Sequence, residues 1–128
     1  LGMPYAYVRT KPKDHGLENL IVGNLKPGLK VMVVNDLLTN ASRSRRVAET
    51  LRDAGCEVVG MVALLDFDFE AGEEALAEME IPVKSLCHYG DLLDVALSQG
   101  VILPGDMAVF QAWHDDPETW APDNSDNE

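Results

Sequence analysis

Cationic side chains alternate along a short segment near the start of the sequence. They are Arg9, Lys11, Lys13 and His15, and neighbouring Pro and Gly residues indicate that the segment is a loop. Three positive charges and a titratable imidazole could clamp a pyrophosphate. Because lysine carries a mobile point charge, such a loop could also close over charge that develops in a transition state. A solvated basic loop that binds nothing is the alternative interpretation, and the spacing alone leaves both open.

A second candidate site follows residues 29–34, an apolar β-branched run that predicts a strand. The run ends at Asn35 and Asp36, and Thr39 and Ser42 come next, at the start of a predicted helix. Ligands of parallel sheets bind beyond the carboxyl ends of the strands, and amide groups at a helix start bind anions. We therefore expect Thr39 and Ser42 to donate to an anion, and Asp36 at the strand tip to bind sugar hydroxyls or a metal. The alternative is an ordinary strand-to-helix turn with Ser42 as the N-cap, because the segment contains no glycine.

Carboxylates cluster farther along the chain, at Asp66, Asp68, Glu70, Glu73 and Glu74. Their spacing lacks the glycine and the alternating ligands of a calcium loop. Acidic residues at this density are typical of a solvated first helical turn, where the helix dipole favours negative charge. The sequence therefore predicts no dedicated metal site.

The elements that must position these residues alternate in type. Strands are predicted at residues 3–9, 19–24, 29–34, 56–65 and 82–86, and helices at 42–54, 69–79, 90–98 and 104–113. The alternation predicts an α/β fold with a mostly parallel central sheet flanked by helices and joined by right-handed crossovers. The continuous apolar run at 29–34 predicts a strand that is buried on both faces. We expect residues 1–120 to form one domain, residues 121–128 to be a disordered acidic tail, and an N-terminal part to be missing, because the sequence opens directly into a strand.

The charge distribution and the composition restrict the partners. The net charge is −12, which argues against nucleic acid as the main partner. Nine basic and four acidic residues lie before Asp53, so this part alone could still attract a polyanion. No apolar run approaches the roughly 20 residues that span a bilayer, which argues against a membrane span. Cys56 and Cys87 lie far apart in apolar contexts, as expected for reduced thiols in a cytoplasmic protein.

The two candidate sites, in this order, resemble those of the orotate phosphoribosyltransferases. Residues 7–16, Tyr-Val-Arg-Thr-Lys-Pro-Lys-Asp-His-Gly, are similar to the catalytic loop of that family, Y-V-R-x-K-x-K-D/E-H-G. Residues 31–42 fall where the family carries its phosphoribosyl-pyrophosphate motif, usually V-V-V-E-D-L-I-T-T-G-G. The resemblance continues through residues 51–58, 86–96 and 113–120, and thus covers nearly the whole chain. It implies a type I phosphoribosyltransferase-like fold without its N-terminal part.

The resemblance also implies a reaction and roles for the residues. Phosphoribosyl would pass from phosphoribosyl pyrophosphate to orotate, giving orotidine monophosphate and pyrophosphate, with Mg²⁺ carried by the pyrophosphate. Lys11, Lys13, His15 and Asp36 would be catalytic, the first three on a mobile loop against the pyrophosphate and Asp36 against the ribose hydroxyls. The residues expected to bind the donor are Arg9, Asn35, Thr39, Asn40, Ala41, Ser42 and Arg43. The family further implies a cytoplasmic homodimer.

Two changes separate the sequence from the family motif. Asn35 stands where the first acid of an acidic pair is usual, and residues 40–43, Asn-Ala-Ser-Arg, replace T-G-G-S. A side chain at a left-handed loop position costs roughly 1–2 kcal/mol, and Asn40 tolerates that geometry better than most residues. The changed loop therefore predicts an altered phosphate site.

Arginines on the first helical turns offer a compensation for the changed loop. Arg43, Arg45 and Arg46 follow it, and an arginine there, Arg43 first, could supply phosphate contacts that the backbone no longer makes. Three hypotheses stay open. The chain belongs to an orotate phosphoribosyltransferase, or it is a non-catalytic phosphate- or nucleotide-binding module on the same fold, or it is an interaction domain whose loop has lost its function.

Overall fold

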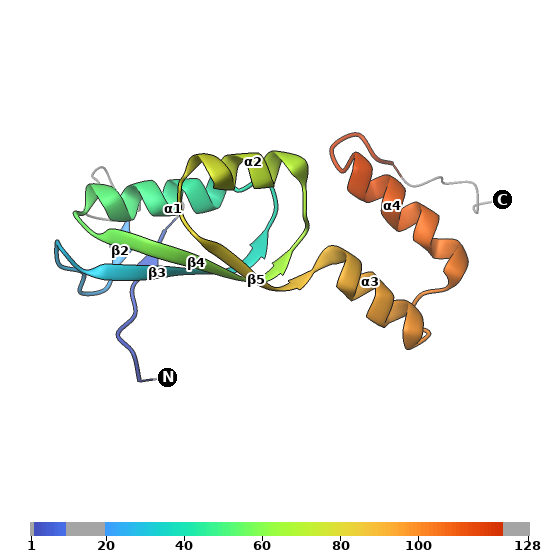
Figure 1. The fold of residues 1–128 in the computed structure, drawn as a ribbon, viewed down its shortest axis with the longest axis horizontal. Helices are drawn as coiled ribbons and strands as arrows, with labels where there is room; N and C mark the ends of the chain where they lie inside the picture. The colour runs from blue at the N-terminus through green and yellow to red at the C-terminus, as the bar shows by residue number, and fades with distance from the viewer. Residues whose placement is uncertain (1, 10–19, 122–128) are drawn as a thin grey trace. The chain divides into compact units, whose positions relative to one another are not determined.

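A computed structural model describes residues 2–9 and 20–121 of the chain. The chain divides into two compact units, and the boundary falls between Cys87 and His88 (Figure 1). Each unit is described by itself below. The extent predicted for a single domain, residues 1–120, stays a prediction, and the predicted tail from residue 122 onward lies outside the described residues.

The first unit is built on a three-stranded sheet of order β3-β4-β5. The strands are β3 (Lys30–Leu38), β4 (Glu57–Asp66) and β5 (Val83–His88). β3 and β4 run parallel, with Val33 opposite Met61 and Asn35 opposite Ala63. The crossovers are α1 (Ser42–Asp53) and α2 (Glu70–Glu78). The predicted α/β fold with a mostly parallel sheet is confirmed.

The two crossover helices lie on the same side of this sheet, as Figure 1 shows. Because the strand order advances in one direction, crossovers of one handedness place both helices on one face. The core lies between this face and the helices, where Val33 is 5% exposed and packs in a cluster with Ala48 and Met61. On the other face, Val34 is 72% exposed. The prediction that residues 29–34 are buried on both faces is therefore wrong for the described part of the chain.

Helix α1 ends where the sequence predicts. Gly55 follows the C-cap residue Ala54 with φ 80°, a left-handed conformation that glycine adopts without strain. The Cys56 amide then donates to the Leu51 carbonyl at 3.0 Å, and β4 begins directly afterwards. Neither Cys56 nor Cys87 forms a disulfide within the described residues.

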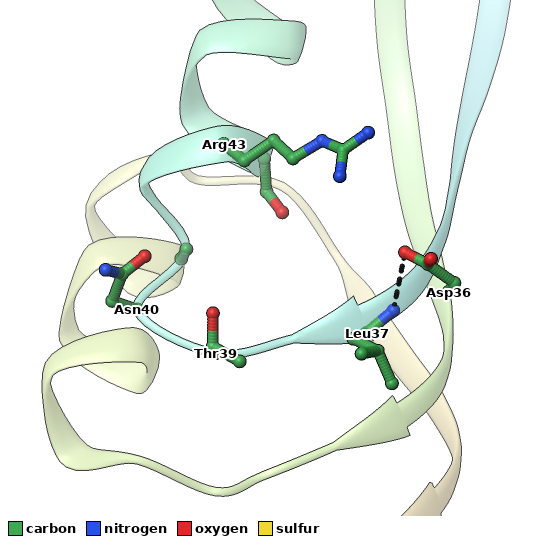
Figure 2. Close-up of a pocket in the computed structure, with 7 residues that line it drawn as sticks. Asp36, Leu37, Thr39, Asn40 and Arg43 are labelled. Atoms are coloured by element: carbon green, nitrogen blue, oxygen red, sulfur yellow. Dashed lines mark hydrogen bonds between the residues drawn. The ribbon is translucent and has the colours of Figure 1, made fainter. Parts of the chain in front are cut away.

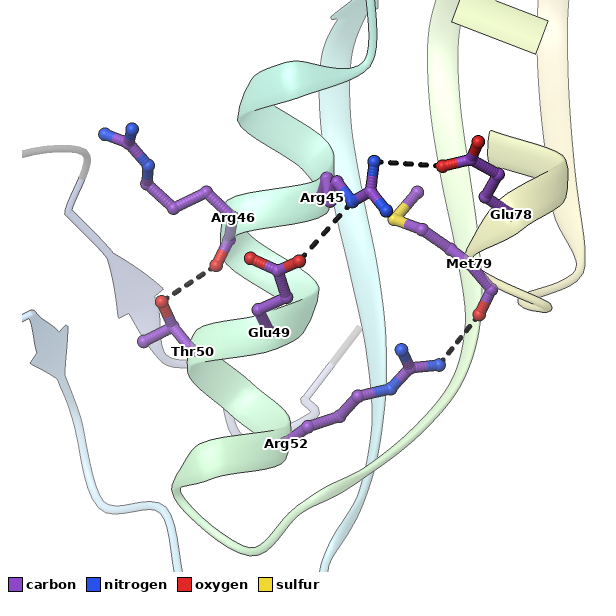
Figure 3. Close-up of polar contacts among 7 residues, drawn as sticks. All are labelled: Arg45, Arg46, Glu49, Thr50, Arg52, Glu78 and Met79. Carbon is purple, nitrogen blue, oxygen red and sulfur yellow. Dashed lines mark hydrogen bonds and ion pairs between the residues drawn. The ribbon is translucent and has the colours of Figure 1, made fainter. Parts of the chain in front are cut away.

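Helix α1 is also tied to helix α2 by arginine side chains (Figure 3). Arg45 forms an ion pair with Glu78 of α2 at 3.0 Å and a longer one with Glu49 of its own helix at 3.4 Å. Near the other end of α1, Arg52 donates to the carbonyl oxygen of Met79 at 2.9 Å. The C-terminal end of α2 is thus held against α1 by two guanidinium groups.

A short antiparallel hairpin precedes the sheet. It pairs β1 (Tyr7–Val8) with β2 (Ile21–Val22), and the Arg9 amide donates to the Leu20 carbonyl at 2.7 Å. Both strands lie inside the ranges predicted for them but are shorter. The predicted residues Lys11, Lys13 and His15 come between the two strands in the sequence and lie outside the described residues.

The second unit consists of helices. They are α3 (Tyr89–Ser98), the 3₁₀ turn η2 (Pro104–Asp106) and α4 (Met107–Asp115). The Tyr89 ring packs against Trp113 and stacks on His114, with ring centroids 5.6 and 4.9 Å apart. The predicted helices are confirmed. None of the helices in the described part of the chain has the length and apolar character that crossing a membrane requires.

Candidate functional site

The site forms where β3 passes into α1. The strand continues to Leu38, beyond the end predicted at Val34, because the ladder with β4 extends to the pair of Leu38 and Asp66. The Phe67 amide then donates to the Leu38 carbonyl at 3.0 Å. Asn35 and Asp36 therefore lie inside the strand, and the loop proper is only Thr39, Asn40 and Ala41.

An open hollow of about 210 Å³ lies beside this loop (Figure 2). Figure 2 shows that the side chains of Asp36, Thr39 and Arg43 point toward the same space. The full lining is Asp36, Leu37, Thr39, Asn40, Ala41, Arg43 and Ser44. A guanidinium, hydroxyl groups and one carboxylate at a helix start can bind an anion on one side and hydroxyl groups on the other.

The loop turns at Ala41, which has φ 56° and is the N-cap residue of α1. The left-handed position thus falls on Ala41 and not on Asn40, although Asn tolerates that geometry better. Instead, the Asn40 side-chain oxygen accepts from the Ser42 amide at 3.2 Å and from the Ser42 hydroxyl at 2.9 Å. The alternative interpretation, with Ser42 as the N-cap, is wrong. Ser42 is the first residue of the helix, and its hydroxyl donates to the side-chain oxygen of Asn40 in the loop.

Asn35 faces α1 and not the hollow. Its side-chain amide donates to the Ser44 hydroxyl at 3.1 Å, and Ser44 is 4% exposed. The alternation along β3 explains this orientation, because Asn35 shares the covered face with Val33. Ser44 was not singled out in the sequence. Its position just after the family motif could have marked it as a site residue, but its burial depends on the packing of α1 on the sheet.

Asp36 points away from the covered face. It is exposed, and its Oδ1 accepts a hydrogen bond from the Leu37 amide at 2.9 Å (Figure 2). Leu37, which was not among the predicted site residues, lines the hollow next to Asp36. The second carboxylate oxygen of Asp36 accepts no hydrogen bond among the described residues, so it can accept from a ligand.

The arginines that follow the loop separate into two kinds. Arg43 lines the hollow and forms no ion pair within the described residues. Arg45 is turned toward α2 and is paired with Glu78. Of these two arginines, only Arg43 can therefore bind an anion in the hollow without giving up an existing contact. Arg9, on the hairpin, is not part of the hollow's lining.

Comparisons with known proteins agree with the family resemblance that the sequence shows. No family model matches the chain. It is 47% identical over 120 residues to the orotate phosphoribosyltransferase of Bacteroides thetaiotaomicron, an alignment that covers 94% of this chain and 57% of the relative. Over these 120 residues the chain is similar to the orotate phosphoribosyltransferases. It spans little more than half the length of the curated relatives that it matches.

The fold of the chain is similar to that of solved phosphoribosyltransferases. It matches the UMP synthase of Leishmania donovani with a TM-score of 0.77 and 25% identity, over 90% of this chain and 24% of that one. It also matches the Mycobacterium tuberculosis orotate phosphoribosyltransferase, solved in complex with 5-phospho-α-D-ribosyl 1-diphosphate, with a TM-score of 0.55 and 30% identity. That match covers 70% of this chain and 50% of the other. The predicted type I phosphoribosyltransferase-like fold is confirmed.

Proposed function

We propose that the chain is part of an orotate phosphoribosyltransferase, and that the hollow beside α1 binds the 5′-phosphate of phosphoribosyl pyrophosphate. The observation that carries this proposal is Arg43, a guanidinium without an ion pair in the described residues, which lines the same hollow as Thr39. Guanidinium groups bind phosphate through paired, charge-assisted hydrogen bonds. The sequence similarity supports phosphoribosyl pyrophosphate as the donor, because the M. tuberculosis relative was solved with that compound.

The reaction would break the bond between the ribose C1 and a pyrophosphate oxygen and form a bond from C1 to a ring nitrogen of orotate, whose proton would pass to the leaving pyrophosphate. Pyrophosphate would leave with the bonding electrons, together with the Mg²⁺ that the donor carries. The exposed Asp36 carboxylate would hold the ribose hydroxyls and stabilise positive charge that develops on the ribose. Lys11, Lys13 and His15, with Arg9, would contact the leaving pyrophosphate. Such catalysis depends mainly on positioning and charge stabilisation.

The proposal includes a cytoplasmic homodimer. Cysteines that are not joined in a disulfide, Cys56 and Cys87, are consistent with a reducing compartment. The exposed apolar side chains of the sheet, such as Val34, are consistent with a covered surface in the working protein. Light scattering on the purified chain tests the dimer, and a monodisperse monomer would contradict it.

The first experiment is calorimetric titration of phosphoribosyl pyrophosphate with Mg²⁺ into the 128-residue chain. We expect saturable binding that is lost when Arg43 is replaced by alanine. The same protein is then mixed with orotate, and the loss of orotate absorbance reports turnover. Absence of donor binding to the unmodified chain would contradict the proposed function.

A second candidate function is phosphate or nucleotide binding without catalysis. The structure favours it at Asn35, whose amide is engaged with Ser44 where the family motif usually has an acid. Binding of phosphoribosyl pyrophosphate without any loss of orotate absorbance would support this second function. Turnover that depends on both substrates would exclude it.

A further inference from the structure

Gly72 of helix α2 lies directly against the loop that forms the hollow. A Cβ atom at this position would overlap the carbonyl oxygen of Thr39 and would lie 3.2 Å from the Thr39 carbonyl carbon and 3.8 Å from the Asn40 Cα. Gly72 is buried and has an ordinary helical backbone, so its conformation does not require glycine. Since glycine inside a helix is less stable than alanine, the close approach of the loop is the physical reason for a glycine here.

The loop and α2 have little freedom to move apart. On one side, the Phe67 amide holds the Leu38 carbonyl at 3.0 Å, immediately before Thr39. On the other side, the C-terminal end of α2 is held to α1 by the ion pair of Arg45 with Glu78 and by the bond from Arg52 to Met79 (Figure 3). A methyl group at residue 72 would therefore strain this contact, and the loop backbone at Thr39, which it meets directly, would have to shift.

We propose that Gly72 is a positioning residue of the phosphate site. By admitting the Thr39 carbonyl against its backbone, Gly72 lets the loop lie deep enough for the Thr39 hydroxyl and Arg43 to face the same hollow (Figure 2). This inference rests on the proposed function for the identity of the ligand. It assigns part of the ligand affinity to a helix that contributes no side chain to the hollow.

The test compares Gly72→Ala with a matched control, Gly90→Ala. Gly90 also lies in a helix, α3, and a Cβ atom there would meet nothing within 4 Å. Amide chemical shifts are recorded without ligand, and phosphoribosyl pyrophosphate with Mg²⁺ is then titrated by calorimetry. At a temperature where both variants are folded, we expect Gly72→Ala to shift the amides of residues 39–44 and to weaken binding at least about tenfold. Gly90→Ala should leave both unchanged.

The outcomes separate a positioning role from a structural one. If Gly72→Ala lowers only the unfolding midpoint, while the folded protein keeps its loop amide shifts and its affinity, the proposal is wrong. If the unmodified chain binds no donor, the proposed function fails, and the loop amide shifts alone decide whether Gly72 positions the loop. If Gly72→Ala does not fold, nuclear Overhauser contacts between the α-protons of Gly72 and Asn40 in the unmodified chain decide, and their absence overturns the proposal.

Discussion

Arg43 and Arg45 lie within one turn at the start of helix α1, but their side chains have different surroundings. Arg43 extends over the hollow and has no ion pair within the described residues, whereas Arg45 is paired with Glu49 and Glu78 (Figures 2 and 3). Farther along the helix, Arg52 is bound to the Met79 carbonyl. One helix thus presents a cation to the hollow at its start and cations to a neighbouring helix along its length.

This difference shows that the role of an arginine depends on what lies opposite to it. Cations in the first turn oppose the helix dipole, so Arg43 is unfavourable there unless an anion binds beside it. Arg45 meets a carboxylate that α2 brings to it, and this offsets the same disadvantage. Replacing each arginine should therefore change a different property of the protein.

Arg43→Ala should have the largest effect. We expect the affinity for phosphoribosyl pyrophosphate to fall by about 2 kcal/mol, about 30-fold in Kd, because a charged hydrogen-bond donor to phosphate is lost. The free energy of unfolding should not fall. Calorimetric titration and urea denaturation measure the two quantities. Arg43→Lys serves as a partial control, since it keeps the charge and removes the planar fork. An unchanged Kd for Arg43→Ala would show that Arg43 contributes no more to donor binding than Arg45 is expected to.

Arg52→Ala should act in the opposite way. The Met79 carbonyl would lose its hydrogen bond, and the free energy of unfolding should fall by about 1 kcal/mol. Donor affinity should stay as it is, because Arg52 does not line the hollow. Urea denaturation followed by circular dichroism measures the loss. A stability equal to that of the unmodified chain would show that the contact with α2 contributes nothing.

Ala41→Gly tests whether the loop before the two arginines is strained. A left-handed alanine costs roughly 1–2 kcal/mol, and the added flexibility of an unfolded glycine offsets roughly half of this. Ala41 is 3% exposed, so loss of its buried methyl group costs up to about 0.8 kcal/mol, and we expect the free energy of unfolding to stay within about 0.5 kcal/mol of that of the unmodified chain. The control is Ala71→Gly, at an exposed helical position of α2, which should be destabilising. Destabilisation by Ala41→Gly as large as that by Ala71→Gly would mean that the loop is not strained at residue 41.

Arg45→Ala should have the smallest effect. Both of its ion pairs involve exposed side chains, and such pairs contribute about 0–1 kcal/mol at ordinary ionic strength. We expect a slight loss of stability that disappears at high salt and an unchanged donor affinity. Thermal denaturation at low and high salt measures the first, and calorimetry the second. If donor affinity fell as far as it does for Arg43→Ala, both arginines would belong to the phosphate site.

Several features of the site were predictable from the sequence, and others were not. The apolar run of β3 and the helical spacing after Ser42 placed the loop between them, and the motif resemblance marked Asp36, Thr39 and Arg43 as donor-binding candidates. Asn35 had the same support, but the structure turns it toward Ser44. The strand was expected to end at Val34, and only the pairing with β4 extends it to Leu38.

The order and type of the elements were determined by the sequence itself, because hydrophobic periodicity, glycine at helix ends and turn residues act over a few neighbouring positions. Tertiary structure decided which face of the sheet is covered, which arginine of α1 is left for a ligand, and why Gly72 must be a glycine. Each of these depends on atoms brought together from distant parts of the chain, such as the Thr39 carbonyl against α2. Local patterns carry no information about such contacts until the sheet and its helices have packed.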